Sequence, residues 1–220
     1  AANIDQVFLM ITLKTPQTFP AFIDRFLVTA LAYDINILLL FNKIDLYDSD
    51  ELRAMRDLKS VYQNIGYECH EVVASDLKTL AVIQSKMEGK VSMFSGHSGA
   101  GKSTLVNSLS PGLDLKTASI SKQHQQGQHT TTFAEMFDLG ASRIIDTPGI
   151  KGFGVVDIQP EELSGYFIEF AALKGSCKFN NCMHTSEPKC AIKEAIEVGK
   201  ITPSRYKSYL QLLEEDSLYR

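Results

Sequence analysis

The sequence lacks three features that would each redirect the interpretation of its function. No apolar run approaches the roughly 20 residues that a helix needs to cross a bilayer. The first residues contain no basic segment followed by an apolar stretch, so no signal peptide is visible. Basic residues are not in excess, because 22 Lys and Arg stand against 26 Asp and Glu, for a net charge of −4. Global charge therefore gives no support for nucleic-acid binding, which would have to depend on local patches.

What remains is the composition of an ordinary globular chain. The 220 residues are 44% hydrophobic and 22% charged, enough for one large domain, alone or with a small second one. These features predict a soluble, cytoplasmic protein. The chain begins at Ala1 without Met and enters a strand-like run within a few residues, so we expect either a fragment or a processed terminus.

Apolar runs and helical periods alternate along the chain. We expect strands at residues 4–13, 35–41, 67–73 and 91–94, and helices at 19–33, 48–65 and 77–87, with a turn near Pro16. Further on we expect a mobile loop at 111–132, a hairpin of strands 132–137 and 142–145, and helices at 161–173, 191–198 and 205–213. This alternation predicts an α/β fold with a doubly wound parallel sheet, whose ligands bind beyond the carboxyl ends of the strands.

Residues 96–103 match in full the pattern G-x-x-x-x-G-K-[ST] of a phosphate-binding loop. The loop follows an apolar strand and leads into a helical run, which is the context that the motif requires. Lys102 would reach the β- and γ-phosphates, and the Ser103 hydroxyl would ligate Mg²⁺. The alternative is a glycine-rich turn that happens to contain a lysine. We expect nucleotide contacts from Gly96, His97, Ser98, Gly99, Ala100, Gly101, Lys102, Ser103 and Thr104.

A second motif precedes the phosphate loop, the N-K-x-D signature formed by Asn42, Lys43, Ile44 and Asp45. The Asp45 carboxylate can accept hydrogen bonds from both N1–H and the 2-amino group of guanine, donors that adenine lacks. Alone, four residues can be a surface turn, but together with a phosphate loop and a D-x-x-G they indicate a guanine-nucleotide site. Ala74 and Ser75 are expected to supply contacts that flank the base.

Residues 146–149, Asp-Thr-Pro-Gly, fit the loop that senses a γ-phosphate. The Asp146 carboxylate would hold Mg²⁺ through water, and the Gly149 N–H would meet the γ-phosphate. A plain loop with a Pro-Gly turn is the alternative. One of the threonines at 130–132 is expected to complete the Mg²⁺ shell, and we assign Thr131, although the sequence does not distinguish the three.

The order of these motifs is rotated relative to ordinary GTPases, in which the phosphate loop comes first and N-K-x-D late. Here N-K-x-D precedes the phosphate loop by about fifty residues, which circular permutation explains. The γ-phosphate sensor then leads directly into the C-terminal region, and we hypothesise that this couples the nucleotide state to the position of that region. We expect a permuted GTPase domain over residues 1–157 and a small, mainly helical zinc-binding domain over residues 158–220.

Cys177, Cys182, His184 and Cys190 form a C-x₄-C-x-H-x₅-C cluster. Three thiolates and one imidazole fill a tetrahedral structural Zn²⁺ site and leave no open position for catalysis. Unligated buried cysteines and a redox role are the alternatives. Residues 174–207 carry seven Lys or Arg against three Glu, a local charge of +4 that would either contact RNA phosphates or form a solvated helix face.

Taken in order, N-K-x-D, the phosphate loop, His-Thr-Thr-Thr at 129–132, Asp-Thr-Pro-Gly and the Cys/His cluster resemble the circularly permuted ribosome-assembly GTPases RsgA/YjeQ. The resemblance covers nearly the whole chain. It implies GTP hydrolysis stimulated by the small (30S) ribosomal subunit, contact with its rRNA and a role in its late maturation. It implies Mg²⁺ with GTP or GDP, one structural Zn²⁺ and an N-terminal OB-fold domain that this sequence does not include. We expect a monomer.

The expected mechanism is attack of water on the γ-phosphate with charge neutralisation by Mg²⁺. Ile150 stands where many GTPases have a water-orienting Gln, so intrinsic hydrolysis should be slow. We assign His129 as the replacement, with a contact to RNA or solvent as the alternative. The expected catalytic set is His129, Lys102 and Gly149. A nucleotide-gated binding module with negligible turnover is the alternative function, and an ATP-dependent enzyme is a third.

Overall fold

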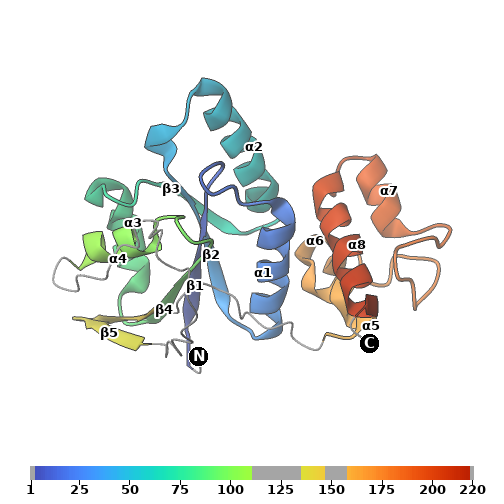
Figure 1. Ribbon diagram of the computed structural model, residues 1–220. Helices are drawn as coiled ribbons and strands as arrows, with labels where there is room; N and C mark the ends of the chain where they lie inside the picture. The colour runs from blue at the N-terminus through green and yellow to red at the C-terminus, as the bar shows by residue number, and fades with distance from the viewer. Residues whose placement is uncertain (1–2, 111–134, 147–157, 219–220) are drawn as a thin grey trace, which may run out of the picture. The chain divides into compact units, whose positions relative to one another are not determined.

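The computed structural model describes residues 3–110, 135–146 and 158–218 (Figure 1). The chain forms two compact units. The first, called here the sheet unit, contains residues 1–18 and 35–151, and the second, the C-terminal unit, contains residues 19–34 and 152–220. Helix α1 (Pro20–Ala32) therefore belongs to the C-terminal unit, although the strands on either side of it in sequence belong to the sheet unit.

One sheet of six strands organises the sheet unit, in the order β3-β2-β1-β4-β6-β5. The strands are β1 (Gln6–Ile11), β2 (Asn36–Asn42), β3 (Glu68–Val72), β4 (Val91–Ser95), β5 (Glu135–Leu139) and β6 (Ser142–Asp146). All neighbouring pairs are parallel except β5 and β6, which form the expected hairpin. The predicted α/β class is confirmed, and the carboxyl ends of the five parallel strands meet at one edge, where ligands bind in such sheets.

Apolar side chains from strands and helices fill the core on one face of this sheet. Helices α3 (Leu77–Met87) and α4 (Lys102–Leu109) lie on this face (Figure 1). Ile83 of α3 and Leu105 of α4 pack in the same cluster as Phe8 and Phe94, whose rings stack with centroids 5.0 Å apart. Full burial of one such side chain contributes about 1.5–3 kcal/mol, so this packing fixes the loop between β4 and α4 at the sheet edge.

Capping residues fix where two helices of the sheet unit begin. Helix α2 (Ser49–Asn64) follows Asp48, whose carboxylate accepts from the Glu51 N–H, while the Glu51 carboxylate accepts from the Asp48 N–H. Helix α3 follows Asp76, whose side chain accepts from the Lys78 N–H. Loss of such a cap costs about 1 kcal/mol. The predicted ranges 48–65 and 77–87 agree with these helices to within one residue.

The C-terminal unit is helical. Besides α1 it contains α5 (Pro160–Leu163), the 3₁₀ helix η2 (Ser164–Tyr166), α6 (Ile168–Ala171), α7 (Ala191–Glu197) and α8 (Pro203–Leu218). Phe167, Phe170 and Tyr209 form its aromatic core, with ring centroids 5.1 to 5.5 Å apart, and Val28 of α1 joins the same cluster. None of the described helices combines the length and the apolar character that a membrane span needs.

A buried arginine joins three helices of the C-terminal unit. Arg205 of α8 is 1% exposed, donates to Asp24 of α1 at 2.7 Å, and donates to both carboxylate oxygens of Glu169 of α6 at 2.7 and 3.1 Å. Burial alone would lower the pKa of Arg205, but the hydrogen bonds and charges of Glu169 and Asp24 outweigh it and raise that pKa, so the guanidinium stays charged. Arg205 therefore does not belong to the exposed basic charge counted over residues 174–207.

One predicted helix is divided. Residues 161–173 were expected to form a single helix, but they form α5, η2 and α6. Gly165 lies at the break, and glycine is about 1 kcal/mol less favourable than alanine in a helix interior. Phe167, which lies between η2 and α6, and Phe170 of α6 are both buried in the aromatic core of this unit. The predicted mobile loop at 111–132 and the residues before the predicted domain boundary at 157 lie outside the described residues.

Candidate nucleotide site and metal centre

The loop between β4 and α4 approaches its neighbours so closely that only glycine fits at two positions. A Cβ on Gly96 would lie 2.6 Å from the Met10 carbonyl oxygen, and a Cβ on Gly101 would lie 2.4 Å from Asn42 Nδ2. Both residues have positive φ angles, 137° and 105°, which residues with side chains rarely adopt. The glycines of the predicted phosphate loop thus let its backbone lie directly against β1 and β2.

Lys102 concentrates positive charge at this loop. Its Nζ donates to the carbonyl oxygens of Gly96 at 2.7 Å and His97 at 2.9 Å. The N–H groups of the first turn of α4, which includes the partly buried Ser103, add the positive end of the helix dipole. Burial, followed by the charge of Lys102, lowers the pKa of His97 and favours the neutral imidazole. The local geometry therefore suits a phosphate group at the carboxyl end of β4.

The side chain of Asn42 joins three of the predicted motifs. It is 1% exposed at the end of β2, its Nδ2 donates to the Ala100 carbonyl at 2.7 Å, and its Oδ1 accepts from the Ala74 N–H at 3.0 Å. One amide therefore bridges the N-K-x-D motif, the phosphate loop and the residues after β3. Since buried polar groups are costly when unpaired, the three segments hold one another in place.

The remaining residues of the N-K-x-D motif lie nearer the surface. Lys43 has a left-handed backbone, with φ of 67°, and its Nζ donates to the Thr15 carbonyl at 2.5 Å. Asp45 lies in the 3₁₀ helix η1 (Ile44–Leu46) and is exposed, as is Ser75 after β3. A carboxylate at the carboxyl end of β2 can accept hydrogen bonds from a ligand whose phosphates lie on the neighbouring loop.

The γ-phosphate side of the predicted site is described only in part. Asp146 is the last residue of β6, which runs parallel to β4, so its backbone lies at the same sheet edge as the phosphate loop. His129, Thr131 and Gly149 lie outside the described residues. The assignments for the catalytic water and for Mg²⁺ therefore stay predictions.

Sequence reasoning missed one segment of the site, residues 12–18, which we call the β1 loop because it follows β1. Hydrogen bonds close it on itself: Thr18 N–H donates to the Thr12 carbonyl at 2.9 Å, and Thr12 N–H donates to Thr18 Oγ1 at 3.2 Å. The Leu13 N–H donates to the Tyr47 hydroxyl at 2.8 Å, which donates to the Asn42 carbonyl at 3.0 Å. The proline and threonines indicated a turn, but no local pattern indicates contact with the N-K-x-D motif.

The four predicted metal ligands lie together in the C-terminal unit. The ligand atoms of Cys177, Cys182, His184 and Cys190 are all within 4.8 Å of one another. Cys177 Sγ lies 4.0 Å from Cys190 Sγ, and His184 Nδ1 lies 3.4 Å from Cys190 Sγ. Tetrahedral ligands at the usual Zn–S and Zn–N bond lengths lie about 3.4–3.8 Å apart, so the cluster has nearly the size that a zinc ion requires.

Burial shifts the pKa values of two residues of this cluster in directions that fit metal binding. It raises the pKa of the Cys182 thiol to about 12, so a thiolate at this position needs a cation beside it. Burial also lowers the pKa of His184, which favours the neutral imidazole that binds metals. The Ala191 N–H donates to the Cys177 sulfur at 3.4 Å. The donor set and its surroundings fit a structural divalent metal.

Residues outside the Cys/His motif hold the metal-binding loop, and sequence reasoning did not identify them. The Tyr206 hydroxyl donates to the His184 carbonyl at 2.6 Å, and the Tyr209 hydroxyl donates to the Met183 carbonyl at 2.8 Å. The Glu187 carboxylate accepts from the Met183 N–H at 2.8 Å. The two tyrosines lie three residues apart on α8, so one face of this helix supports the loop.

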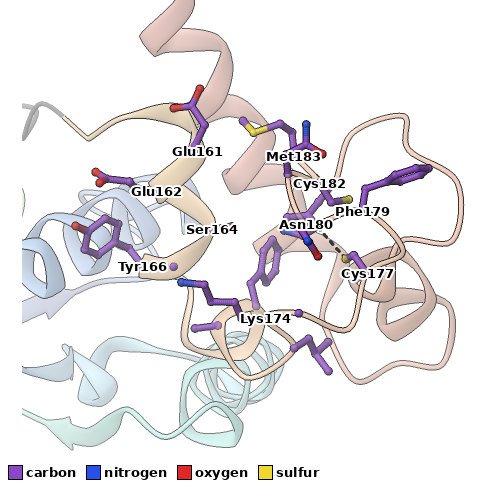
Figure 2. Close-up of a pocket in the computed structure, with 17 residues that line it drawn as sticks. Glu161, Glu162, Ser164, Tyr166, Lys174, Cys177, Phe179, Asn180, Cys182 and Met183 are labelled. Atoms are coloured by element: carbon purple, nitrogen blue, oxygen red, sulfur yellow. Dashed lines mark hydrogen bonds between the residues drawn. The ribbon is translucent and has the colours of Figure 1, made fainter.

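A pocket of about 680 Å³ lies beside the metal cluster (Figure 2). Glu161 and Glu162 of α5 line it from one side, and Phe179 and Asn180 of the loop between the first two cysteines line it from another. Lys174 lines it too, and Phe179 is 40% exposed. None of the predicted nucleotide-binding residues lines this pocket, so it is distinct from the site on the sheet.

Comparisons with known proteins give consistent matches in sequence and in fold. A sequence model of the RsgA GTPase family matches residues 1–156. The small ribosomal subunit biogenesis GTPase RsgA of Christiangramia forsetii is 60% identical over 222 residues, covering 100% of this chain and 70% of the relative. The protein of the same name from Flavobacterium johnsoniae is 58% identical over 217 residues, covering 98% of this chain and 67% of the relative.

Two solved structures have the same fold. YjeQ from Thermotoga maritima matches with a TM-score of 0.82 at 38% identity, over 97% of this chain and 71% of that one. YloQ, described as a circularly permuted GTPase, matches with a TM-score of 0.81 at 32% identity, over 99% of this chain and 70% of that one. The fold expected from the rotated order of motifs is therefore confirmed.

Proposed function

The chain belongs to the RsgA GTPase family, and on this premise we propose that it hydrolyses GTP to GDP and phosphate in the biogenesis of the small ribosomal subunit. The observation that carries the proposal is the Asn42 side chain, which bonds to both Ala100 and Ala74. These contacts bring the base-reading motif and the phosphate loop to one sheet edge, although the sequence presents them in rotated order. A guanine nucleotide is the ligand that uses both.

In this proposal each motif acts on a different part of the nucleotide. Asp45 selects guanine by accepting hydrogen bonds from N1–H and the 2-amino group, and Ala74 and Ser75 flank the base. Residues 96–104 surround the phosphates, and Lys102 neutralises charge that develops on the γ-phosphate. This assignment is supported by the exposure of Asp45 and by the two carbonyl contacts that hold Lys102 over the loop.

Hydrolysis requires groups on the γ-phosphate side. Ser103, Thr131 and Asp146 would hold Mg²⁺, which supplies charge neutralisation on the phosphates when bound. The Gly149 N–H would meet the γ-phosphate and His129 would orient the attacking water. The position of Asp146 at the end of β6, beside the strand that leads into the phosphate loop, supports its part in this set.

We assign residues 1–157 to the GTPase domain, except for helix α1, which belongs structurally to the C-terminal unit. Residues 158–220 form a domain built around one structural Zn²⁺ held by the three cysteines and His184. The partner is the small (30S) ribosomal subunit with its rRNA, and the protein acts as a monomer in the cytoplasm. The relatives' printed name supports the subunit as partner. Exposed lysines at positions 174, 178 and 189 near the metal cluster support a contact with RNA phosphates.

The test is GTPase activity of this chain with and without purified small ribosomal subunits. We expect slow turnover alone and faster turnover with the subunits. Absence of stimulation would instead favour a nucleotide-gated binding module. The base assignment is tested by Asp45→Asn, which should shift preference from guanine to xanthine nucleotides, whereas Asp57→Asn on the exposed face of α2 should not. For the water-orienting group, unchanged subunit-stimulated turnover in His129→Ala would contradict our assignment.

A further inference from the structure

Helix α1 lies within the sequence of the sheet unit but belongs structurally to the C-terminal unit. The chain therefore crosses from one unit to the other before this helix and crosses back after it. The first passage, from Thr18 to Phe19, joins the β1 loop directly to this helix. We propose that the β1 loop positions the nucleotide site and that α1 connects this loop to the metal-bearing C-terminal unit. The metal state of that unit then changes the rate at which the site releases guanine nucleotide. This proposal rests on the nucleotide site proposed above.

The β1 loop contacts the nucleotide site at three points. The Thr15 carbonyl accepts from the Lys43 ammonium of the N-K-x-D motif, and the Leu13 N–H is joined through Tyr47 to the Asn42 carbonyl. A Cβ built on Gly99 of the phosphate loop would lie 3.7 Å from Pro16 Cδ, so the β1 loop also abuts the phosphate loop. Movement of the β1 loop therefore acts on both halves of the site.

The β1 loop is held rigid by hydrogen bonds between its own residues. Thr12 and Thr18, at its two ends, are 1% and 3% exposed and are joined by two hydrogen bonds. The Thr12 hydroxyl donates in addition to the Pro16 carbonyl at 2.5 Å. A loop closed by its own hydrogen bonds has few alternative conformations, so a shift at Thr18 moves Thr15 and Pro16 with it.

On the other side, α1 is fixed to the metal centre through α8. Asp24 of α1 pairs with Arg205 of α8, and both side chains are at most 1% exposed. The next residue of α8, Tyr206, donates to the carbonyl of the metal ligand His184. A continuous series of contacts therefore runs from the metal loop through α8 to α1, and the chain itself joins α1 to Thr18 at the end of the β1 loop. Sliding of α1 along α8 would break a buried ion pair, which is strongly unfavourable.

The experiment measures release of fluorescently labelled GDP from the chain loaded with Zn²⁺ and from the chain stripped of metal by a chelator. We expect metal loss to change the release rate by about fivefold or more, the lower end of usual allosteric coupling. Two glycines inserted between Thr18 and Phe19 make the connection between the β1 loop and α1 flexible, while the β1 loop and the Asp24–Arg205 pair are both retained. This variant should release labelled GDP at the same rate in both metal states.

The matched control is the same insertion at the other end of α1, between Asp34 and Ile35, which leads into the amino end of β2, away from the nucleotide site. It should keep the response to metal. A milder variant, Thr18→Val, removes only the side-chain acceptor for the Thr12 N–H and should reduce the response. Equal release rates in both metal states of the unmodified chain, or the same response in both insertion variants, would overturn the link. Failure of the unmodified chain to bind labelled GDP would instead refute the proposed function.

Discussion

Replacing Asn42 by alanine tests whether one buried amide holds the nucleotide site together. The substitution removes both the hydrogen bond to the Ala100 carbonyl and the one from the Ala74 N–H. Each buried backbone group left without a partner costs about 1–3 kcal/mol, so the full loss is about 2–6 kcal/mol. Water entering between the separated segments recovers part of it. In the variant, binding of GDP has to bring the separated segments together again, so part of this loss opposes binding. Because about 1.4 kcal/mol corresponds to a tenfold change in Kd, we expect affinity for GDP to fall at least tenfold.

Calorimetric titration with GDP measures the affinity, and urea unfolding measures the stability of the same variant. Asn64→Ala is the control, since Asn64 is exposed at the end of α2. Asn42→Asp keeps an oxygen facing the Ala74 N–H but places a second oxygen against the Ala100 carbonyl, so it should bind GDP no better than Asn42→Ala. A Kd within twofold of the unmodified chain for Asn42→Ala would refute the reasoning.

Three further results are expected. Gly101→Ala should abolish GDP binding in calorimetry because its Cβ would lie 2.4 Å from an amide nitrogen, whereas Gly165→Ala, with open space around its Cβ, should bind normally. Chelation or Cys190→Ser should remove the metal, detected by elemental analysis, and lower the thermal midpoint, whereas Cys69→Ser should keep the metal. The pKa of His97 is lowered in the folded state, so the unfolded state binds a proton at this residue more readily. The contribution of neutral His97 to the free energy of unfolding is therefore complete above about pH 6.5 and is lost as the pH falls. In metal-loaded protein, His97→Asn should therefore flatten the decline of unfolding free energy below pH 6.5, and an unchanged slope would contradict this.

The parts of the nucleotide site that depend on local pattern were predictable from the sequence. The phosphate loop needs glycines at fixed spacing between a strand and a helix, and all of these requirements are visible in residues 91–109. The placement of Asp45 and Lys102 at one sheet edge followed from parallel topology alone. The role of Asn42 as a bridge did not, because its partners lie 58 and 32 residues away and no spacing rule relates them.

The grouping of α1 with the C-terminal unit was not predictable either. The helical period at 19–33 is clear, and α1 forms there. The grouping of α1 with the C-terminal unit depends on the pair of Asp24 and Arg205, which are 181 residues apart in the sequence. An isolated carboxylate or guanidinium in a helical stretch is normally interpreted as a solvated surface group, since charged residues are almost never fully buried unless paired. Only the folded chain brings these two charges together.

Strand order in the sheet differs from the order in which the strands are synthesised. β1, β2 and β3 leave the ribosome before β4 and can pair with one another, but the other edge of β1 stays open until β4 is synthesised. About fifty residues separate the N-K-x-D motif from the phosphate loop, which at usual rates of translation is a delay of about 3–10 s. During that interval no nucleotide can stabilise the nascent half-sheet, and its open edge is the point at which a growing chain would be captured by a chaperone or by another unpaired strand.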